Sequence, residues 1–570
     1  MLVLLLGWRI WRMFCPRTSW LDQPAIFFLL ILSALLALRL PQIGWAHEIS
    51  VDESQMLAQG MRYLSHPVPW RDVDGTTSGP LDSWLITAPM LPGAPATWAT
   101  VRTMLWAANC ATLIFIYLAL RSFGTRPEAQ LTLLPTVFFY AFVLNPEYTH
   151  YSGETLPVLL LSIMVWLLCR AWVRKEFSNP GLFLAGFIAG CIPFAKLQAS
   201  PLAAFLWAMA LAEIIFLHRK NYGRKLGLLC LGGVLFPALL LGLVLACGAG
   251  NDFWKSYILA PMAYTHESLP TKIKALWMLF SQGVDFRSYF VSALAGGVAL
   301  SAAWCYVREP KLGSKLGVPL AAIAALGALA IFCVLVSGKG FGHYLLLLIP
   351  ALSVFFGLVL VAGKSLLCSP EEADPQLFPK PVHYFLAGLA IIFCLQIGKV
   401  PKYFRITRVF LTLRTVDRKS FVARRILKAS RPGDTLSVWG WMPGYYVETG
   451  LMPATRDAIG HFIIEPGPYR DYYQQRYLSD LKQSRPAIFV DAMAWGVFTW
   501  TWPTLMPHEA CPGLGRFIDD NYTLWLTVHI LAARGAGVPV RIYLLKSRMA
   551  ELQLTPEELT IPRDPSLAPE

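Results

Sequence analysis

The chain is predicted to be an α-helical polytopic membrane protein with a small α/β domain at its C-terminal end, and three observations support this fold class. Of its 570 residues, 55% are hydrophobic and only 15% are charged, whereas soluble domains are usually about one quarter charged. Apolar runs near the length of a membrane span recur between residues 22 and 398. From about residue 430 the long apolar runs give way to short strand-like and helix-like segments separated by turns.

The first 21 residues are predicted to form a cytoplasmic segment. Arg9, Arg12 and Arg17 follow a short apolar run, whereas a signal peptide places its basic residues before that run. The first span is therefore expected to act as an uncleaved anchor.

Eleven apolar runs in the region 22–398 predict a domain of about 11 transmembrane helices. They lie at roughly 22–40, 98–120, 131–146, 154–173, 181–197, 199–217, 225–247, 289–307, 317–337, 343–362 and 383–398. Because a spanning helix needs about 20 residues, the short runs at 131–146 and 383–398 are the least typical of the set.

The charges of the loops predict how the chain is oriented. Loops on one side are rich in Lys and Arg, as in RSFGTR, RAWVRK, HRKNYGRK and REPKLGSK, whereas the loop 41–97 carries six acidic and two basic residues. Because basic loops remain in the cytoplasm, the loop 41–97 is predicted to be external. An odd number of spans then places the C-terminal domain outside the plasma (inner) membrane. The net charge of +14 follows from these loops, so nucleic acid is not expected as a partner.

Three segments follow the spans. The basic stretch 399–429 is predicted to be an amphipathic linker on anionic headgroups. An extracytoplasmic α/β domain is expected over 430–550, and a Pro- and acid-rich disordered tail over 551–570. Within the domain we expect strands at 435–441, 487–493 and 541–547, and helices or turns at 469–483 and 511–522. Most of the eleven cysteines lie in apolar runs and none forms a CxxC pair, so no disulfide framework is expected.

An adjacent acid pair, Asp52 and Glu53, follows the first span. Solvation or capping of a helix that begins near residue 52 would explain an isolated pair. However, the external ends of later spans carry further polar groups: Glu154, Lys196, Gln198, Lys339, His343 and Tyr344. A buried cation is costly unless it meets an anion, so these groups are expected to converge on one external cavity. For Lys196 the alternative is snorkelling to the surface, and for His343 and Tyr344 it is an interfacial aromatic belt.

Four segments resemble, in order and membrane position, the GT-C glycosyltransferases of the protein-mannosyltransferase and aminoarabinose-transferase type. The matching pieces are DESQMLAQGMRYL with DVDGTTSGPLDSWL, then HYSGETLPVLLLS, FLAGFIAGCIPFAKLQASP and GHYLLLLIPAL. This resemblance covers roughly residues 20–400, and VWGWMPGYYVETGLMPATR resembles the external domain of some bacterial members.

The resemblance implies transfer of a monosaccharide from a polyprenyl-phosphate donor to an extracytoplasmic glycan, lipid or protein acceptor, with inversion. It implies that Asp52 or Glu53 is the catalytic acid of the first external loop, and we favour Asp52 as the base. Lys196, Lys339, His343 and Arg62 are candidates to meet the departing phosphate. Glu154 resembles the family's second acid, which binds sugar or acceptor.

One departure from the family pattern concerns phosphate binding. Where the aminoarabinose transferases have Lys-Pro-Pro-Leu, this chain has Ser78, Gly79, Pro80 and Leu81, so the phosphate charge must be met elsewhere. Asp72 and Asp74 also resemble the metal-binding DxD of soluble glycosyltransferases. We expect no cofactor, and a divalent metal is the alternative.

Two other functions fit a polytopic protein of this kind. A transporter or flippase of lipid-linked sugars would need charged or broken-helix sites near the bilayer midplane, and few are found in the sequence. The third hypothesis is a non-catalytic envelope-assembly protein with a degenerate GT-C fold. Substitution of Asp52 by Asn distinguishes these, because only an enzyme would lose transfer.

Overall fold

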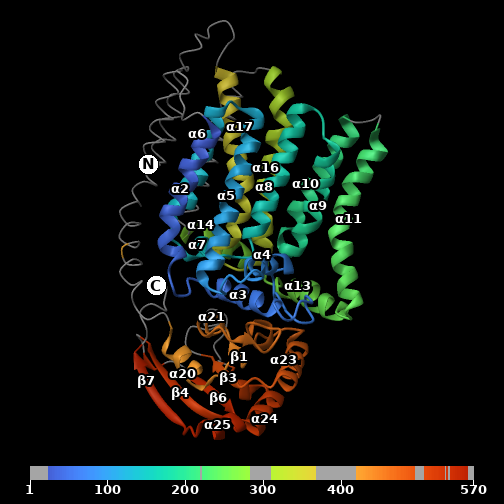
Figure 1. Ribbon diagram of the computed structural model, residues 1–570. Helices are drawn as coiled ribbons and strands as arrows, with labels where there is room; N and C mark the ends of the chain where they lie inside the picture. Colours follow the sequence, from blue (N-terminus) through green and yellow to red (C-terminus); the bar gives the residue numbers. More distant parts are fainter. Residues whose placement is uncertain are drawn as a thin grey trace.

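The structure is a computed structural model that describes residues 23–217, 221–282, 310–367, 408, 419–493, 506–532, 535–536 and 539–562. A bundle of long helices forms one part of the molecule, and a mixed β-sheet with its helices forms the other (Figure 1). The predicted runs at 289–307 and 383–398 and the N-terminal segment 1–21 lie outside the described residues, as does most of the predicted linker 399–429.

The long helices of the bundle coincide with nine of the predicted apolar runs. They are α2 (Pro24–Ile43), α5 (Trp98–Phe123), α6 (Arg126–Phe142), α8 (Thr155–Arg174), α9 (Asn179–Ala195), α10 (Ser200–Leu217), α11 (Tyr222–Ala246), α16 (Pro310–Ser337) and α17 (Ile349–Leu367). Within the described residues, seven helical segments are long and apolar enough to cross a membrane, and α9 is a shorter apolar helix. The chain is a multi-pass α-helical membrane protein, and the total of about 11 spans stays a prediction.

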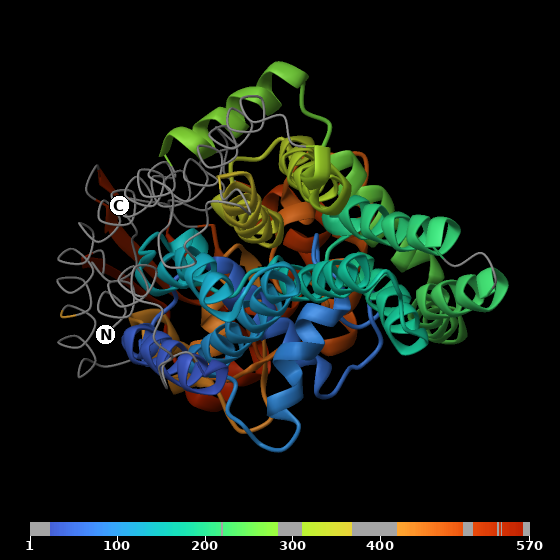
Figure 2. The ribbon, with the colours of Figure 1, turned by 90° about the horizontal axis from the view of Figure 1, so that it is seen from above.

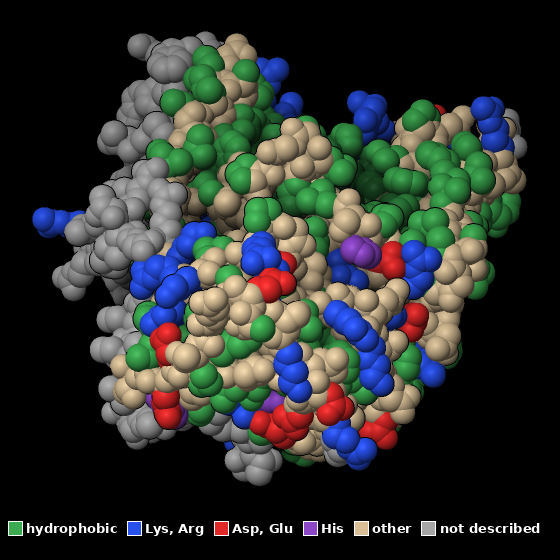
Figure 3. All heavy atoms as spheres, turned by 60° about the horizontal axis from the view of Figure 1, so that its bottom comes forward, with side chains coloured by type: hydrophobic (Ala, Val, Ile, Leu, Met, Phe, Trp, Pro, Cys, Tyr) green, Lys and Arg blue, Asp and Glu red, His purple; other side chains and the backbone are tan. Residues whose placement is uncertain are grey.

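The outer surface of the bundle is hydrophobic. On α11, Leu231, Val234 and Leu239 are between 57% and 65% exposed, as expected for side chains that face lipid rather than water. Figure 3 shows hydrophobic side chains over the bundle, whereas acidic and basic side chains gather over the C-terminal domain. Inside the bundle, α9 and α11 approach closely through glycine, since a Cβ at Gly186 would lie 2.1 Å from the Leu229 carbonyl oxygen.

Short elements form a layer at one end of the bundle. They are α3 (Val51–Tyr63), α4 (Pro80–Met90), α7 (Pro146–Thr149), the 3-10 helices η2 (Leu197–Ala199) and η5 (Gly342–Leu348), α12 (Gly250–Asp252), the π-helix η4 (Phe253–Leu259), α13 (Ala260–Tyr264) and α14 (Leu269–Gln282). Figure 1 shows α3 and α13 between the long helices and the C-terminal domain. Figure 2, a view down the bundle, shows much of that domain beneath the helices.

The C-terminal domain is built on a seven-stranded sheet in the order β2-β1-β3-β6-β4-β5, with β7 also paired to β4. Its strands are β1 (Thr435–Gly440), β2 (Met452–Pro453), β3 (Ile488–Ala492), β4 (Tyr522–Ala532), β5 (Gly535–Ala536), β6 (Val540–Leu545) and β7 (Glu557–Pro562). β1 pairs in parallel with β2 and β3, β6 is antiparallel to β3 and β4, β5 is antiparallel to β4, and β7 is parallel to β4. The helices are α20 (Phe421–Ala429), α21 (Gly444–Thr449), α22 (His461–Ile464), α23 (Arg470–Ser484), the 3-10 helix η6 (His508–Ala510), α24 (Pro512–Asn521) and α25 (Lys546–Leu552).

The structure differs from the sequence expectation at the end of this domain. The tail 551–570 was expected to be disordered, but Glu557–Pro562 forms β7 beside β4, so the disorder prediction is wrong for these residues. The Pro- and acid-rich composition of the tail suggested disorder, but Leu559 of this segment packs against the core of the domain. The long strand β4 was also absent from the expected elements.

The C-terminal domain is joined to the loop 41–97 by buried charges. Arg476 of α23 donates to Asp74 of the loop at 2.7 Å and is also paired with Asp457. Asp74, Asp457 and Arg476 are called the interdomain cluster below. A backbone hydrogen bond from Asp74 N to the Arg456 carbonyl, 3.0 Å long, adds to this contact. The domain is thereby fixed over the end of the bundle where the predicted site residues lie.

Candidate active site

The acid pair opens the helix α3. Ser50 is its N-cap, and the Ser50 side chain accepts a hydrogen bond from Asp52 N at 3.3 Å. Negative charge in the first helical turn is favoured by the helix dipole, so Asp52 and Glu53 both stabilise the start of α3. Because successive helix residues point about 100° apart, the two carboxylates face different surroundings.

Glu53 faces the protein interior and is fully buried. Its two carboxylate oxygens pair with the Arg102 guanidinium at 2.5 and 3.1 Å. Arg102 also donates to the backbone carbonyls of Gln42, Trp45 and His47. The buried charges of Glu53 and Arg102 are therefore both stabilised by hydrogen bonds. Glu53 therefore ties α3 to α5 and is absent from the cavity lining.

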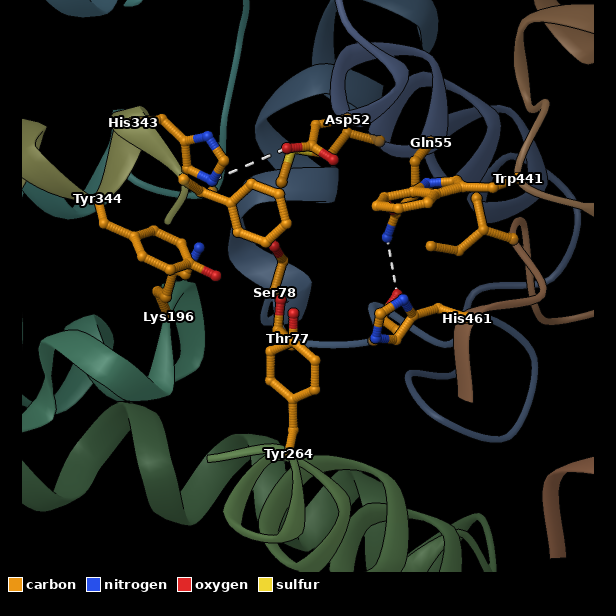
Figure 4. Close-up of a pocket in the computed structure, with 15 residues that line it drawn as sticks. Asp52, Gln55, Thr77, Ser78, Lys196, Tyr264, His343, Tyr344, Trp441 and His461 are labelled. Atoms are coloured by element: carbon orange, nitrogen blue, oxygen red, sulfur yellow. Dashed lines mark hydrogen bonds and ion pairs between the residues drawn. The ribbon is translucent and has the colours of Figure 1, made fainter. Parts of the chain in front are cut away.

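Asp52 faces a cavity of about 60 Å³ between the bundle, the loop 41–97 and the C-terminal domain. The cavity is lined by Asp52, Gln55, Met56, Thr76, Thr77, Ser78, Gly153, Lys196, Tyr264, Phe341, His343, Tyr344, Trp441, Ile459 and His461. Figure 4 shows Asp52 and His343 facing each other across one part of it, and Trp441 and His461 on another side. With 29% of its side chain exposed, Asp52 is accessible to a substrate.

Two imidazoles face the Asp52 carboxylate. The Nε2 atoms of His150 and His343 lie 3.7 and 3.8 Å from Asp52 Oδ2. Each ring is held from its other side, since His150 Nδ1 bonds to the Pro146 carbonyl at 2.7 Å and His343 Nδ1 bonds to Glu147 at 2.9 Å. Their Nε2 atoms are thereby fixed toward the carboxylate without closing a hydrogen bond to it.

These contacts shift the acid–base equilibria of the site. Burial alone would lower the pKa of His150, but Asp52 and Glu147 outweigh it and raise that pKa to about 9. Burial raises the pKa of Asp52, but His150, His343 and Lys196 together hold it well below its usual range. At neutral pH, His150 is therefore a cation and Asp52 is ionised.

Lys196 brings a further cation to the cavity. It follows α9 at a non-helical position, is 4% exposed and pairs with the fully buried Glu154. Its Nζ lies 4.8 Å from the centroid of the Tyr344 ring, a cation–π distance. The backbone of Lys196 also bridges to that of Ser78. Asp52, His150, Lys196 and His343 are called the cavity cluster below.

Four predicted binding residues lie outside this lining. Glu154 lies directly behind it, paired with Lys196 and 3.9 Å from His343 Nε2. Arg62 is about 15 Å along α3 from Asp52 and donates to the carbonyls of Asp72 and Pro453. Gln198 donates to the Cys333 carbonyl at 2.8 Å, and Lys339 pairs with Glu267 at 3.2 Å and lines a neighbouring cavity. The expectation that Gln198 and Lys339 line the Asp52 cavity is therefore wrong, and the phosphate-binding role of Arg62 stays a prediction.

Sequence reasoning missed five contributors. They are Glu147, His150, Tyr264, Trp441 and His461. Glu147 and His150 could have been predicted from the sequence, because they precede Glu154 in the same connection between two apolar runs. The three others come from the loop region after α11 and from the C-terminal domain, and no local pattern marks them.

Asp72 and Asp74, which resemble a metal-binding DxD sequence, both pair with arginines. Asp72 binds Arg71 at 2.8 Å, and Asp74 belongs to the interdomain cluster. Asp52, His150 and His343 each present one ligand atom within 4.8 Å of the others, a set whose donor types suit a divalent cation. Binding of a cation there would require the His150 ring to release the proton that Asp52 and Glu147 favour.

Comparison with solved structures shows the fold of the chain, which is the GT-C fold. It is similar to ArnT from Cupriavidus metallidurans in the apo state, with a TM-score of 0.51 and 13% identity over 93% of this chain and 99% of that chain. ArnT bound to undecaprenyl phosphate gives a TM-score of 0.49 at 13% identity, with the same coverage. The apo oligosaccharyltransferase of Archaeoglobus fulgidus gives 0.43 at 12% identity over 81% and 69% of the two chains. No protein-family model and no curated protein sequence matches the chain.

Proposed function

We propose that the protein is a membrane glycosyltransferase that moves a monosaccharide from a polyprenyl-phosphate donor to an extracytoplasmic glycan, lipid or protein acceptor, with inversion. The observation that carries this proposal is one accessible carboxylate, Asp52, faced by the side chains of Lys196, His150 and His343. The GT-C fold shared with ArnT supports it. We place the enzyme in the plasma (inner) membrane with its C-terminal domain on the extracytoplasmic side, as the loop charges indicate.

The chemistry requires one negative and several positive groups. The acceptor hydroxyl oxygen forms a bond to the anomeric carbon while the bond from that carbon to the phosphate oxygen breaks. The acceptor proton goes to Asp52, and polyprenyl phosphate leaves with the electron pair of the broken bond. A positioned general base contributes about 10²–10⁴-fold to such a step, and Lys196, His150 and His343 stabilise the departing phosphate.

The charges also suggest when Asp52 becomes an effective base. In the cavity without substrate, the neighbouring cations lower the proton affinity of Asp52. A bound phosphate would share the field of these cations, and the proton affinity of Asp52 would rise as a result. Donor binding thus prepares Asp52 for the acceptor proton. Because the cavity cluster supplies this positive charge itself, we propose that the reaction needs no metal ion.

The decisive experiment compares Asp52→Asn with Asp72→Asn, an acid of the same loop outside the cavity lining. Purified proteins are assayed for release of polyprenyl phosphate and transfer of labelled sugar, before and after treatment with a chelator. We expect Asp52→Asn to lose about 10²–10⁴-fold in rate with unchanged thermal stability, and Asp72→Asn to retain transfer. Survival of transfer in Asp52→Asn would refute the base assignment, and loss on chelation would refute the metal-free mechanism.

A further inference from the structure

A second cavity, of about 170 Å³, lies beside the Asp52 cavity. It is lined by Ala260, Ala263, Tyr264, His266, Glu267, Lys339, Phe462 and Glu465, and by Pro466, Gly467, Pro468, Tyr469 and Arg470. We call it the Glu465 cavity. Tyr264 lines both cavities, and Figure 4 shows its ring directed toward the Asp52 cavity.

The wall between the two cavities is thin. His461 lines the Asp52 cavity, and its Nε2 lies 2.7 Å from the Glu465 carboxylate, which lines the other cavity. The rings of Tyr264 and His461 are 5.2 Å apart. A molecule in the Glu465 cavity is therefore separated from the catalytic cavity by a single layer of side chains.

The lining of the Glu465 cavity combines aromatic rings with balanced charges. Lys339 lies 3.2 Å from Glu267 and 4.5 Å from the centroid of the Tyr264 ring. The other two charged residues are Glu465 and Arg470, so the formal charges of the cavity cancel if His266 is neutral. Carboxylates accept hydrogen bonds from hydroxyl groups, and aromatic faces such as those of Phe462 and Tyr469 contact apolar C–H surfaces.

The surroundings of this cavity favour one of the three acceptor classes. Its outer edge is the exposed turn Pro466, Gly467 and Pro468 of the C-terminal domain, so the ligand arrives from water and not from the lipid side. None of its lining residues belongs to a β-strand, so it offers no strand edge to an extended peptide. The cancelling charges disfavour a strongly anionic ligand.

We propose that the Glu465 cavity binds a neutral glycan acceptor and directs one of its hydroxyl groups past Tyr264 toward Asp52. This inference rests on the proposed transferase function and narrows its acceptor to a hydroxyl-rich, uncharged saccharide. Tyr469 and Phe462 supply stacking surfaces, and Glu465 accepts hydrogen bonds from sugar hydroxyls.

The test measures binding, so that it does not depend on turnover. Full-length Asp52→Asn protein in detergent is titrated with chitotetraose, maltotetraose and mannotetraose, and with undecaprenyl phosphate, by calorimetry. Mannose 6-phosphate and a serine-containing hexapeptide are the comparators. The same titrations are repeated after adding Tyr469→Ala or, as a matched control, Tyr222→Ala on the exposed start of α11.

We expect at least one neutral tetrasaccharide to bind, and Tyr469→Ala to weaken that binding about tenfold without changing undecaprenyl phosphate binding. Tyr222→Ala should leave both affinities unchanged. The proposal is overturned if no neutral tetrasaccharide binds, if Tyr469→Ala has no effect, or if the peptide or the phosphorylated sugar binds through Tyr469 instead. If a tetrasaccharide binds but undecaprenyl phosphate does not, the donor assignment fails while the glycan site stands.

Discussion

Two groups of charged side chains include residues of the loop 41–97, and they are built differently. In the interdomain cluster, Arg476 donates to Asp74 and to Ser256 at 2.7 Å each. In the cavity cluster, Asp52 lies 3.7 Å from His150 and 3.8 Å from His343. Short charge-assisted hydrogen bonds close the first group, whereas the second group leaves its charges separated around a cavity.

This difference separates a structural from a functional use of the same residue types. Buried charges are tolerated when hydrogen bonds offset their desolvation, and both terminal nitrogens of Arg476 donate directly to neighbouring side chains, including Asp74 and Asp457. In contrast, the His150 Nε2 that faces Asp52 has no hydrogen-bond partner among the described residues. Perturbed and incompletely paired charges in a cleft are typical of binding and catalytic sites, so spacing rather than burial identifies the site.

The largest effect on stability is expected from Arg476→Met. This change leaves Asp74 and Asp457 buried without their cation, which costs about 3–5 kcal/mol. Thermal unfolding in detergent should show a clearly lowered midpoint, whereas Arg516→Met, at an exposed arginine of α24, should not change it. An unchanged midpoint together with lost transfer would mean that Arg476 belongs to the functional site.

The sequence predicts the parts of this contrast that depend on local pattern. Lipid offers the backbone no hydrogen-bond partners, so a spanning segment must be a complete helix with apolar side chains. Such helices are visible in the sequence as long apolar runs, and nine of the predicted runs coincide with described helices. Asp52, Lys196, His343 and Tyr344 were expected together because they lie at the same ends of their spans, and the structure brings them to one cavity.

Other features depend on tertiary contacts that no local pattern encodes. Glu53 differs from Asp52 only because Arg102, 49 residues later, meets it from α5. Lys339 fits the expected pattern of a site cation but is turned toward Glu267. Trp441 and His461 reach the cavity through the docking of a separate domain, so their roles become visible only in the folded chain.

The next effect concerns the pH dependence of the cavity cluster. Because the pKa of His150 is raised to about 9, its positive charge is present below that pH and is lost as the pH rises through it. We expect kcat/KM to fall on the alkaline side near pH 9, and His150→Asn to lose about 10²-fold at pH 7 together with this alkaline limb. His66→Asn, in an exposed turn, is the control. An unaltered alkaline limb in His150→Asn would assign the titration to another group.

A smaller effect is expected from a pair of glycines. A Cβ at Gly153 would lie 2.6 Å from Ser78 Oγ and 3.2 Å from Lys196 Nζ, both ends of side chains that can move. A Cβ at Gly79 would lie 1.9 Å from the Phe194 carbonyl oxygen, which is backbone. Gly153→Ala should therefore lower transfer about tenfold by displacing Lys196 while keeping stability, whereas Gly79→Ala should lower the unfolding midpoint. Equal losses of stability in both variants would contradict this assignment.

The smallest effect tests the contact between the two parts of the molecule. Glu48 lies against Gly444 of the C-terminal domain, where a Cβ would be 2.8 Å from Glu48 Oε2, and burial raises the pKa of Glu48 to about 7. The folded state thus holds this proton more tightly than the unfolded chain, so the contribution of Glu48 to stability falls as the pH rises from about 4.5 to 7. Glu48→Gln should remove this loss and stabilise the protein at pH 8 by on the order of 1 kcal/mol, with little effect at pH 5. Unfolding midpoints of the wild type and Glu48→Gln at the two pH values measure this gain in stability. Glu551→Gln on α25 is the exposed control. A gain in stability of equal size at pH 5 would show that the charge of Glu48 is not its cause.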